Sequence, residues 1–299
     1  MTGEVTMYCN GIRACLLAAL TLTGTAPAMA AGEASGKVAV MKGGTIAPTH
    51  AAAYLTRDPK DARVRIVEVV LSDQPIDAAA ATQALNPHSD VINQDALKGR
   101  DYVLLWIRSD GEVSMNATFG ETMTQYIEVS GGALKASLTA NTLDRVAGRL
   151  STAKPITVMD GASYTVDLTF STDVTRLPAG TRLPAGGGDP GKALTAFVGA
   201  AEDKNWPAIQ SGSSERALKS FAADYRTAAE NAEYTQDLLH AWLPKAKLTV
   251  TGGEVRGNVA DLDVEGEMFP GTTGIYVARM VKQGEVWAFD GASVLGMAP

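Results

Sequence analysis

Four acidic residues alternate with apolar or small residues along one stretch of the chain. Carboxylates are the oxygen ligands that calcium prefers, but calcium sites gather them through turns and backbone carbonyls rather than along a straight strand. Alternation with a period of two places all four carboxylates on one face of a strand. We therefore predict a solvent-facing row of acids, which becomes a binding feature only if this face lines a hollow. The four residues are Asp261, Asp263, Glu265 and Glu267.

The three histidines, His50, His88 and His240, stand far apart in the sequence. None has a second His or a Glu at the helical spacing that metal sites use. No serine-hydrolase pattern or phosphate-binding loop appears in the strand-to-helix context that such sites need, because the glycines Gly186 to Gly188 fall in a predicted linker. We expect no metal, no cofactor and no catalytic residue.

Large aromatic side chains are concentrated in the second half of the chain. Core packing and ligand binding both reward the burial of aromatic area, and core packing is the more usual role. Trp206 stands before Pro207, and Trp242 stands before a Leu-Pro helix stop, so these two are the best candidates for a pocket mouth. The candidate ligand-pocket residues are Trp206, Phe221, Tyr225, Trp242 and Trp287.

Residues 1–30 have the pattern of a secretory signal peptide. Arg13 precedes an apolar run from Ala14 to Leu22, and the small residues Ala28-Met29-Ala30 follow. This order of basic, apolar and small residues is typical of export signals, and the apolar run is shorter than the roughly 20 residues that a membrane span needs. We predict cleavage after Ala30, a bacterial periplasmic or secreted location, and no membrane span.

The composition excludes several partners and chemistries. Both cysteines, Cys9 and Cys15, lie in the predicted signal peptide, so the mature chain has neither a disulfide nor a thiol nucleophile. The formal net charge is -7 at pH 7, and no cluster of Lys and Arg stands out along the sequence. Phosphate backbones and anionic membranes attract basic surfaces. We therefore expect neither nucleic acid nor an anionic membrane as a partner.

A duplicated hexapeptide divides the chain. Thr-Arg-Leu-Pro-Ala-Gly occurs twice in succession from Thr175 to Gly186, followed by more Gly and Pro. A solvated linker tolerates such a duplication at little cost. We predict a linker over residues 175–190 between a domain at 31–174 and a domain at 191–299.

The first domain has the pattern of an all-β sandwich. Short runs rich in β-branched and aromatic residues are separated by turn signals, and Ser109-Asp110-Gly111 between two such runs predicts a hairpin. Residues 77–85 form the one predicted short helix, and two packed sheets would bury the apolar faces of so many strands. The predicted strands are 38–41, 64–71, 102–108, 112–119, 125–129, 133–138, 156–159 and 164–170.

The second domain changes to helical periodicity and then returns to strands. Helices are predicted from Pro190, from Ser213 or Ser214 through Tyr225 to Ala228, and from about Glu233 to Trp242. Helices followed by a meander favour an α+β layer with helices packed on one sheet. The predicted strands are 247–251, 259–269, 274–282, 285–290 and 293–296, with turns at 252–253, 256–258 and 283–284.

This second domain resembles the nuclear transport factor 2-like superfamily, which includes ketosteroid-isomerase-like and lumazine-binding-like proteins. The resemblance rests on the order of a helix over Ala193–Ala201, the step Asp203–Trp206, further helices, Thr251–Val255 and Gly284–Trp287. It implies an α+β cone, in which a curved antiparallel sheet wraps around helices. Some members use the cone as an apolar pocket or an active site, although a fold does not by itself supply a function.

The first domain resembles uncharacterised secreted proteobacterial proteins, which adds no chemistry. The resemblance rests on Leu71–Ile76, Ala147–Leu150 and Tyr164–Asp167.

An isomerase-type site in the cone would need a carboxylate base and a hydroxyl donor in one apolar hollow. Asp224, Tyr225 and Asp237 are the available residues, but neighbours on a helix point in different directions, so Asp224 and Tyr225 do not share a face. We therefore predict an exported binding or interaction protein that receives a small apolar ligand or an envelope protein and has no catalytic activity. Two alternatives stay open: an isomerase or cyclase using Asp224 or Asp237, and an immunity or inhibitor protein for an envelope-acting toxin.

Overall fold

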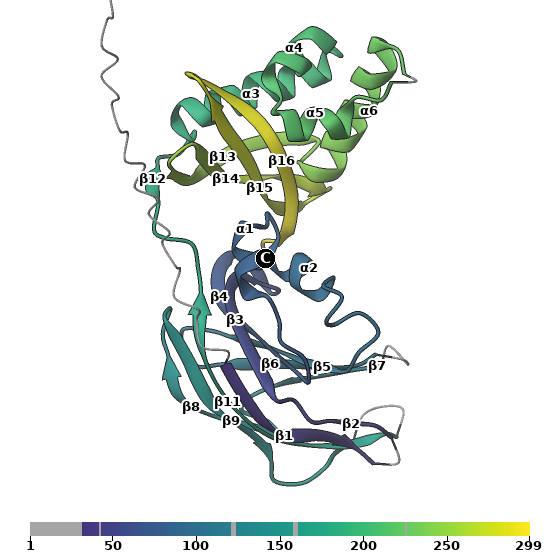
Figure 1. Cartoon of the computed structure of the whole chain (residues 1–299), viewed down its shortest axis with the longest axis vertical. Helices are drawn as coiled ribbons and strands as arrows, with labels where there is room; N and C mark the ends of the chain where they lie inside the picture. Colours follow the sequence, from purple (N-terminus) through teal and green to yellow (C-terminus); the bar gives the residue numbers. More distant parts are fainter. Residues whose placement is uncertain (1–31, 42, 121–123, 158–160, 225) are drawn as a thin grey trace, which may run out of the picture.

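A computed structural model describes residues 32–41, 43–120, 124–157, 161–224 and 226–299 (Figure 1). The predicted signal peptide, its cleavage position at Ala30, and both cysteines lie outside these residues. Over the described residues the protein is mostly β, with one large sheet, one small sheet and six helices.

The N-terminal part forms an eleven-stranded sheet in the order β7-β6-β5-β4-β3-β1-β11-β9-β8, with β2 and β10 paired at its sides. Side chains from both ends of this order, such as Leu105 in β5 and Leu150 in β9, belong to one core, so the sheet curls around it. The strands are β1 (Gly32–Val40), β2 (Thr45–Ile46), β3 (His50–Asp58), β4 (Asp61–Ser72), β5 (Tyr102–Ile107), β6 (Val113–Phe119), β7 (Thr124–Val129), β8 (Leu134–Asn141), β9 (Arg145–Thr152), β10 (Ile156–Thr157) and β11 (Ser163–Thr175).

This single sheet corrects the predicted pair of separate sheets. β1 pairs with β11, and β3 pairs with both, so hydrogen bonds join the two ends of the order without a break. β3 was not predicted because Ala51, Ala52 and Ala53 have low strand propensity. Both faces of β3 are covered, and small side chains suit a strand with cores on either side. The Ser109–Gly111 hairpin is confirmed between β5 and β6, with Gly111 at φ +88°.

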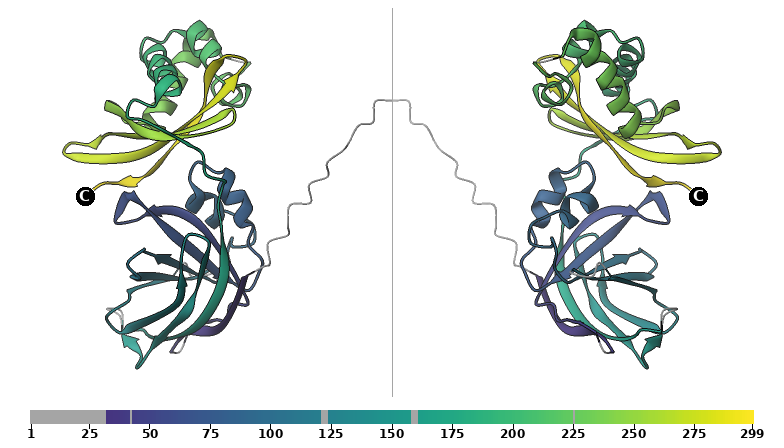
Figure 2. Two further views of the ribbon diagram at one scale, coloured as in Figure 1. Left: turned by 90° about the vertical axis from the view of Figure 1, so that its left-hand side faces the viewer. Right: turned by 90° about the vertical axis from the view of Figure 1, so that its right-hand side faces the viewer.

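Two short helices, α1 (Ala78–Gln83) and α2 (Pro87–Ile92), cover the outer face of β3, β4 and β5. Asp77 caps α1, which lies within the helix predicted over residues 77–85. Helix α2 was not predicted; Asn86 caps it and Pro87 is its first residue. Both views of Figure 2 place these helices between the two sheets.

The C-terminal part is a five-stranded antiparallel sheet in the order β12-β13-β14-β15-β16 with helices on one face (Figure 1). Its helices pack on Leu262, Tyr276 and Phe289, which form the second core. The elements are β12 (Thr181–Leu183), α3 (Gly188–Glu202), α4 (Trp206–Gly212), α5 (Glu215–Phe221), α6 (Ala228–Trp242), β13 (Ala246–Arg256), β14 (Val259–Phe269), β15 (Thr272–Gln283) and β16 (Val286–Met297).

Two local predictions in this part are wrong. Gly252 and Gly253 lie within β13 instead of forming a turn, because a register shift between Val250 and Gly252 absorbs them. The second predicted helix ends at Phe221, and Ala222 is extended. The predicted step at Asp203–Trp206 is confirmed as the break between α3 and α4, where Asn205 caps α4 and Pro207 is tolerated in its first turn.

Both copies of the duplicated hexapeptide make specific contacts with the rest of the protein. In the first copy the Arg176 side chain pairs with Asp144, and the Pro178 carbonyl accepts a hydrogen bond of 2.9 Å from Arg256 Nε. The second copy forms β12, which pairs with β13. Gly186 and Gly187 therefore stand between β12 and α3, and Gly188 begins α3, contrary to the prediction that these glycines do not lie between a strand and a helix.

Candidate functional site

A hollow of about 410 Å³ lies between the N-terminal part, with its helices α1 and α2, and the face of the C-terminal sheet opposite helices α3 to α6. We call this sheet face the cleft face. We call the hollow the arginine cleft, because six arginines line it together with three carboxylates. Its charged lining residues are Arg57, Arg65, Arg176, Arg182, Arg256, Arg279, Glu254, Asp261 and Asp263. In a chain of net charge -7, this is a local concentration of positive charge.

The N-terminal wall carries two arginines side by side. Arg57 on β3 stands directly opposite Arg65 on β4 in the strand register, and both line the cleft. Like charges directly opposite each other destabilise a sheet. Arg57 is compensated across the cleft, since its Nη2 lies 2.5 Å from Asp263 Oδ1. Burial lowers the pKa of Arg57, Asp263 opposes this, and the charge of Arg65 lowers it further.

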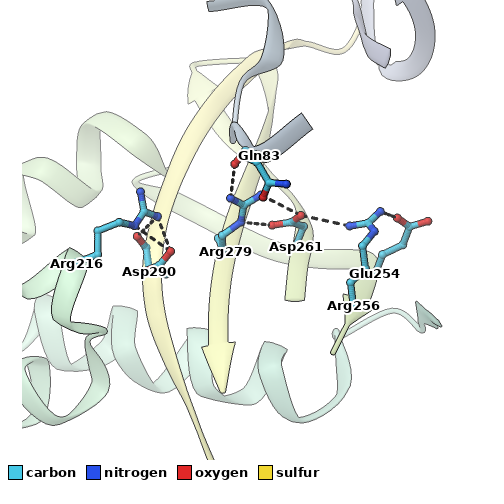
Figure 3. A network of polar contacts seen from close by, with 7 residues as sticks. All are labelled: Gln83, Arg216, Glu254, Arg256, Asp261, Arg279 and Asp290. Carbon is cyan, nitrogen blue, oxygen red and sulfur yellow. Dashed lines mark hydrogen bonds and ion pairs between the residues drawn. The ribbon is translucent and has the colours of Figure 1, made fainter. Parts of the chain in front are cut away.

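The C-terminal wall holds a chain of ion pairs (Figure 3). Arg279 donates two hydrogen bonds to the Asp261 carboxylate, from Nε to Oδ1 at 2.7 Å and from Nη2 to Oδ2 at 3.2 Å. Arg256 Nη1 lies 3.4 Å from Oδ2 of the same carboxylate. Arg256 also pairs with Glu254. Arg279 Nη1 reaches across to the Gln83 carbonyl at 2.6 Å, where the last turn of α1 presents unsatisfied acceptors. The wall is therefore preorganised and connects to the N-terminal part.

Two arginines of the cleft have no carboxylate partner among the residues that the structure describes. They are Arg65 on β4 and Arg182 on β12, and both are exposed. They stand on different walls, one from each sheet. Guanidinium groups offer paired donors that match carboxylate, sulfate or phosphate oxygens. The cleft therefore has free capacity for an anion.

Most of the remaining lining residues are apolar. Six of them are Leu or Val, and Leu143 among these is 57 % exposed. Exposed aliphatic surface beside cations suits a ligand that has both an anionic group and an apolar portion. The six are Leu55, Leu85, Leu143, Leu177, Val277 and Leu295.

The predicted aromatic residues lie elsewhere, in and around the core between the helices and the C-terminal sheet. Phe221 is fully buried, with its ring centroid 6.1 Å from Phe289 and 6.2 Å from Trp242. Trp206 is buried, and Trp287 packs partly buried against the same core. None of these four lines the arginine cleft, and Tyr225 lies outside the described residues.

The predicted acids divide into two groups. Asp224 and Asp237 are both exposed, so neither stands in a hollow beside a hydroxyl donor, which removes the geometric basis of an isomerase site built on them. The alternating row behaves differently. Asp261 and Asp263 face the arginine cleft in ion pairs, so for them the solvent-facing prediction is wrong. The opposite face of the same strand is buried as predicted.

Glu265 and Glu267, the other half of that row, border a second hollow of about 350 Å³. Lys247 Nζ lies 3.0 Å from Glu267 Oε2, which neutralises that carboxylate. Within the described residues no group of three or more His, Cys, Asp or Glu side chains could hold a metal ion. At the start of α3, Asp189 occupies the first helical turn, where its negative charge disfavours an anion.

The sequence reasoning missed the cleft because its arginines are scattered over more than two hundred positions. One signal was present in the repeat, since each copy of the hexapeptide supplies one cleft arginine, Arg176 and Arg182.

Comparison of the chain with protein-family models, with curated proteins and with solved structures finds no match. The resemblance to the nuclear transport factor 2-like superfamily therefore stays a prediction. Among the described helices, none combines the length and apolar character that crossing a bilayer requires.

Proposed function

We propose that this chain is an exported, non-catalytic binding protein whose arginine cleft receives a small ligand with an anionic group and an apolar portion. The observation that carries the proposal is the surplus of cations: six arginines line the cleft against its three carboxylates and the Asp144 that pairs with Arg176, and Arg65 and Arg182, on opposite walls, form no ion pair among the described residues. The ligand's anion would relieve the repulsion between Arg57 and Arg65, and its apolar portion would cover Leu55 and neighbouring leucines.

The proposal also covers the architecture. We assign a first domain before the duplicated hexapeptide and a second, cone-like domain after it, with the ligand bound between them. Separate hydrophobic cores in the two parts and the placement of the cleft between them support this division. Clefts between domains are common places for ligand sites. The predicted apolar ligand is therefore replaced by an amphipathic anion.

Calorimetric titration with octyl sulfate tests this function, because sulfate keeps its charge over the working pH range. We expect octyl sulfate to bind, and 1-octanol and octyltrimethylammonium not to bind. Arg65→Ala and Arg182→Ala should each weaken binding about tenfold, since a charge-assisted hydrogen bond contributes about 1.5–3 kcal/mol.

The matched control is Arg149→Ala, which removes an exposed arginine paired with Asp167 on β11, outside the cleft lining. Its affinity should equal that of the unmodified protein. Absence of octyl sulfate binding, or equal losses in Arg65→Ala and Arg149→Ala, would rule out the cleft as the anion site.

A further inference from the structure

A buried carboxylate lies behind one wall of the arginine cleft. Glu68 on β4 is fully buried and accepts hydrogen bonds from three side chains. Tyr54 Oη donates to Oε1 at 2.8 Å, and Trp106 Nε1 donates to Oε2 at 3.2 Å. His88 Nδ1 lies 2.8 Å from Oε1 and 3.0 Å from Oε2. A buried charge needs this degree of compensation, and the cluster supplies it.

The three donors come from three different elements. Tyr54 stands on β3, Trp106 on β5 and His88 on α2, so one carboxylate on β4 joins the strands on either side of β4 to a helix that packs over them. His88 is the point of attachment for α2, and its ring centroid lies 6.3 Å from that of Trp106. Bonds from separate elements to one buried group fix their relative positions.

The joined elements include a wall of the cleft. Tyr54 lines the cleft, and the segment from Ala81 through Leu85 to Pro87 forms the side that Arg279 reaches through the Gln83 carbonyl. The buried side chains of α1 itself are small, Ala78 and Ala81, while α2 buries Val91. Alanine contributes little buried apolar area, so the polar attachment adds to the positioning of this wall.

We infer that Glu68 is a positioning residue for the cleft, which holds the wall formed by α1 and α2 in the place where it meets the ligand. The inference deepens the proposed function and rests on it: the cleft must bind an anion for the wall to matter. Glu68 itself does not line the cleft, so it acts through Tyr54 and His88.

The attachment depends on pH. Burial disfavours the charged imidazolium, but the hydrogen bond and the charge of Glu68 outweigh burial and raise the pKa of His88 above its ordinary value. The groups that contact the ring are Glu68 from β4 and the indole of Trp106 from β5, and the neutral Tyr54 hydroxyl from β3 bonds the same Oε1 of Glu68 as His88 does. Because its pKa is raised, protonated His88 makes its full contribution to stability at pH values below the unfolded pKa of about 6.5. This contribution is lost as the pH rises through the pKa of His88 in the folded state.

Glu68→Gln tests the inference without changing the size of the side chain. The amide still accepts from Trp106 through its oxygen, but its nitrogen then faces Tyr54 and His88 and carries no charge. We expect amide hydrogens of residues 78–92 to exchange about tenfold faster, the pKa of His88 measured by NMR to fall, and the affinity for octyl sulfate to drop about threefold to tenfold. The pH dependence of that affinity between pH 6 and 8 should flatten.

Glu112→Gln is the matched control, because it removes a partly exposed carboxylate that lies in the β5–β6 turn and pairs with Lys60 in the β3–β4 turn. It should leave exchange in residues 78–92 and ligand affinity unchanged. If Glu68→Gln does not fold, Trp106→Phe removes one donor from the cluster and should give the faster exchange and the weaker affinity at smaller size, while the pKa of His88 stays raised because Glu68 keeps its charge.

The outcomes separate the two proposals. Faster exchange with unchanged affinity and an unchanged pH profile would make Glu68 merely structural and overturn the inference, while the loss of binding in Arg65→Ala would still support the function. Absence of octyl sulfate binding by the unmodified protein would overturn both. An unchanged exchange rate in Glu68→Gln would overturn the positioning role alone.

Discussion

The two faces of the C-terminal sheet use the same strands for opposite purposes. On the helix face, Leu262 and Phe289 are fully buried against α3 to α6, and the rings of Phe289 and Phe197 stack at 4.5 Å. On the cleft face, Asp261 and Arg279 form ion pairs beside a hollow. In β14 the two faces alternate residue by residue. One strand thus supplies both the core and the candidate site.

The comparison shows how charge is tolerated at a partly buried surface. The helix face gains stability from burial of apolar area, which depends on volume and packing. The cleft face gains order from carboxylates that each hold one or two guanidinium groups, and this depends on matched partners. Mutations on the two faces should therefore differ in kind. The first face should report on stability, and the second on stability and binding together.

The largest effect should come from the helix face. Phe289→Ala leaves a cavity beside Phe197 and Phe221, and such truncations cost about 3–5 kcal/mol. Urea unfolding measures the change, with Val286→Ala as control, because Val286 is 63 % exposed on the same strand and should cost less than about 0.5 kcal/mol. Equal losses in the two variants would contradict the assignment of this face as the core.

A smaller and two-sided effect should come from the cleft face. Asp261→Asn removes the carboxylate shared by Arg279 and Arg256, so we expect a loss of about 1–3 kcal/mol in unfolding free energy. The same change frees cations, so affinity for octyl sulfate should rise roughly fivefold, or about 1 kcal/mol. Asp167→Asn, in an exposed pair with Arg149, should change neither quantity. A fall in affinity would contradict the charge argument.

The smallest effect should come from the ion pair that joins α3 to α6. Burial opposes ionisation of Glu202, but hydrogen bonds from His240 and Gln236 outweigh burial and lower the pKa of Glu202. Because its pKa is lowered, ionised Glu202 stabilises the fold at pH values above its unfolded pKa of about 4.3. This stabilisation is lost as the pH falls through the pKa of the folded state. Glu202→Gln should therefore lower stability by at most about 0.5 kcal/mol at pH 6.

This pH effect is checked by the melting temperatures of both proteins between pH 6 and pH 3. The difference should shrink toward zero at the acid end. A difference that grows on acidification would show that Glu202 is not held ionised by its partners in α6.

Local patterns in the sequence determined much of the secondary structure. The alternation in 259–269 predicted strand β14 with its bounds, and the turn residues Ser109-Asp110-Gly111 predicted the β5–β6 hairpin. Period-two and turn signals are local, because they follow from backbone geometry within a few residues. Where local propensity opposed the tertiary environment, as in the alanine-rich β3, the sequence reasoning failed.

Only the tertiary structure decided where charges meet. Arg57 pairs with Asp263, and Arg279 donates a hydrogen bond to the Gln83 carbonyl, although the partners are separated by roughly two hundred residues in the sequence. No local pattern indicates such pairs. The buried Glu68 is equally hidden, because its partners Tyr54, His88 and Trp106 come from three separate elements. Sequence determined which faces of the strands are apolar, since periodicity is a short-range property. Packing of the two sheets decided that the polar face of β14 closes a cleft instead of facing water, since long-range contacts depend on the whole fold.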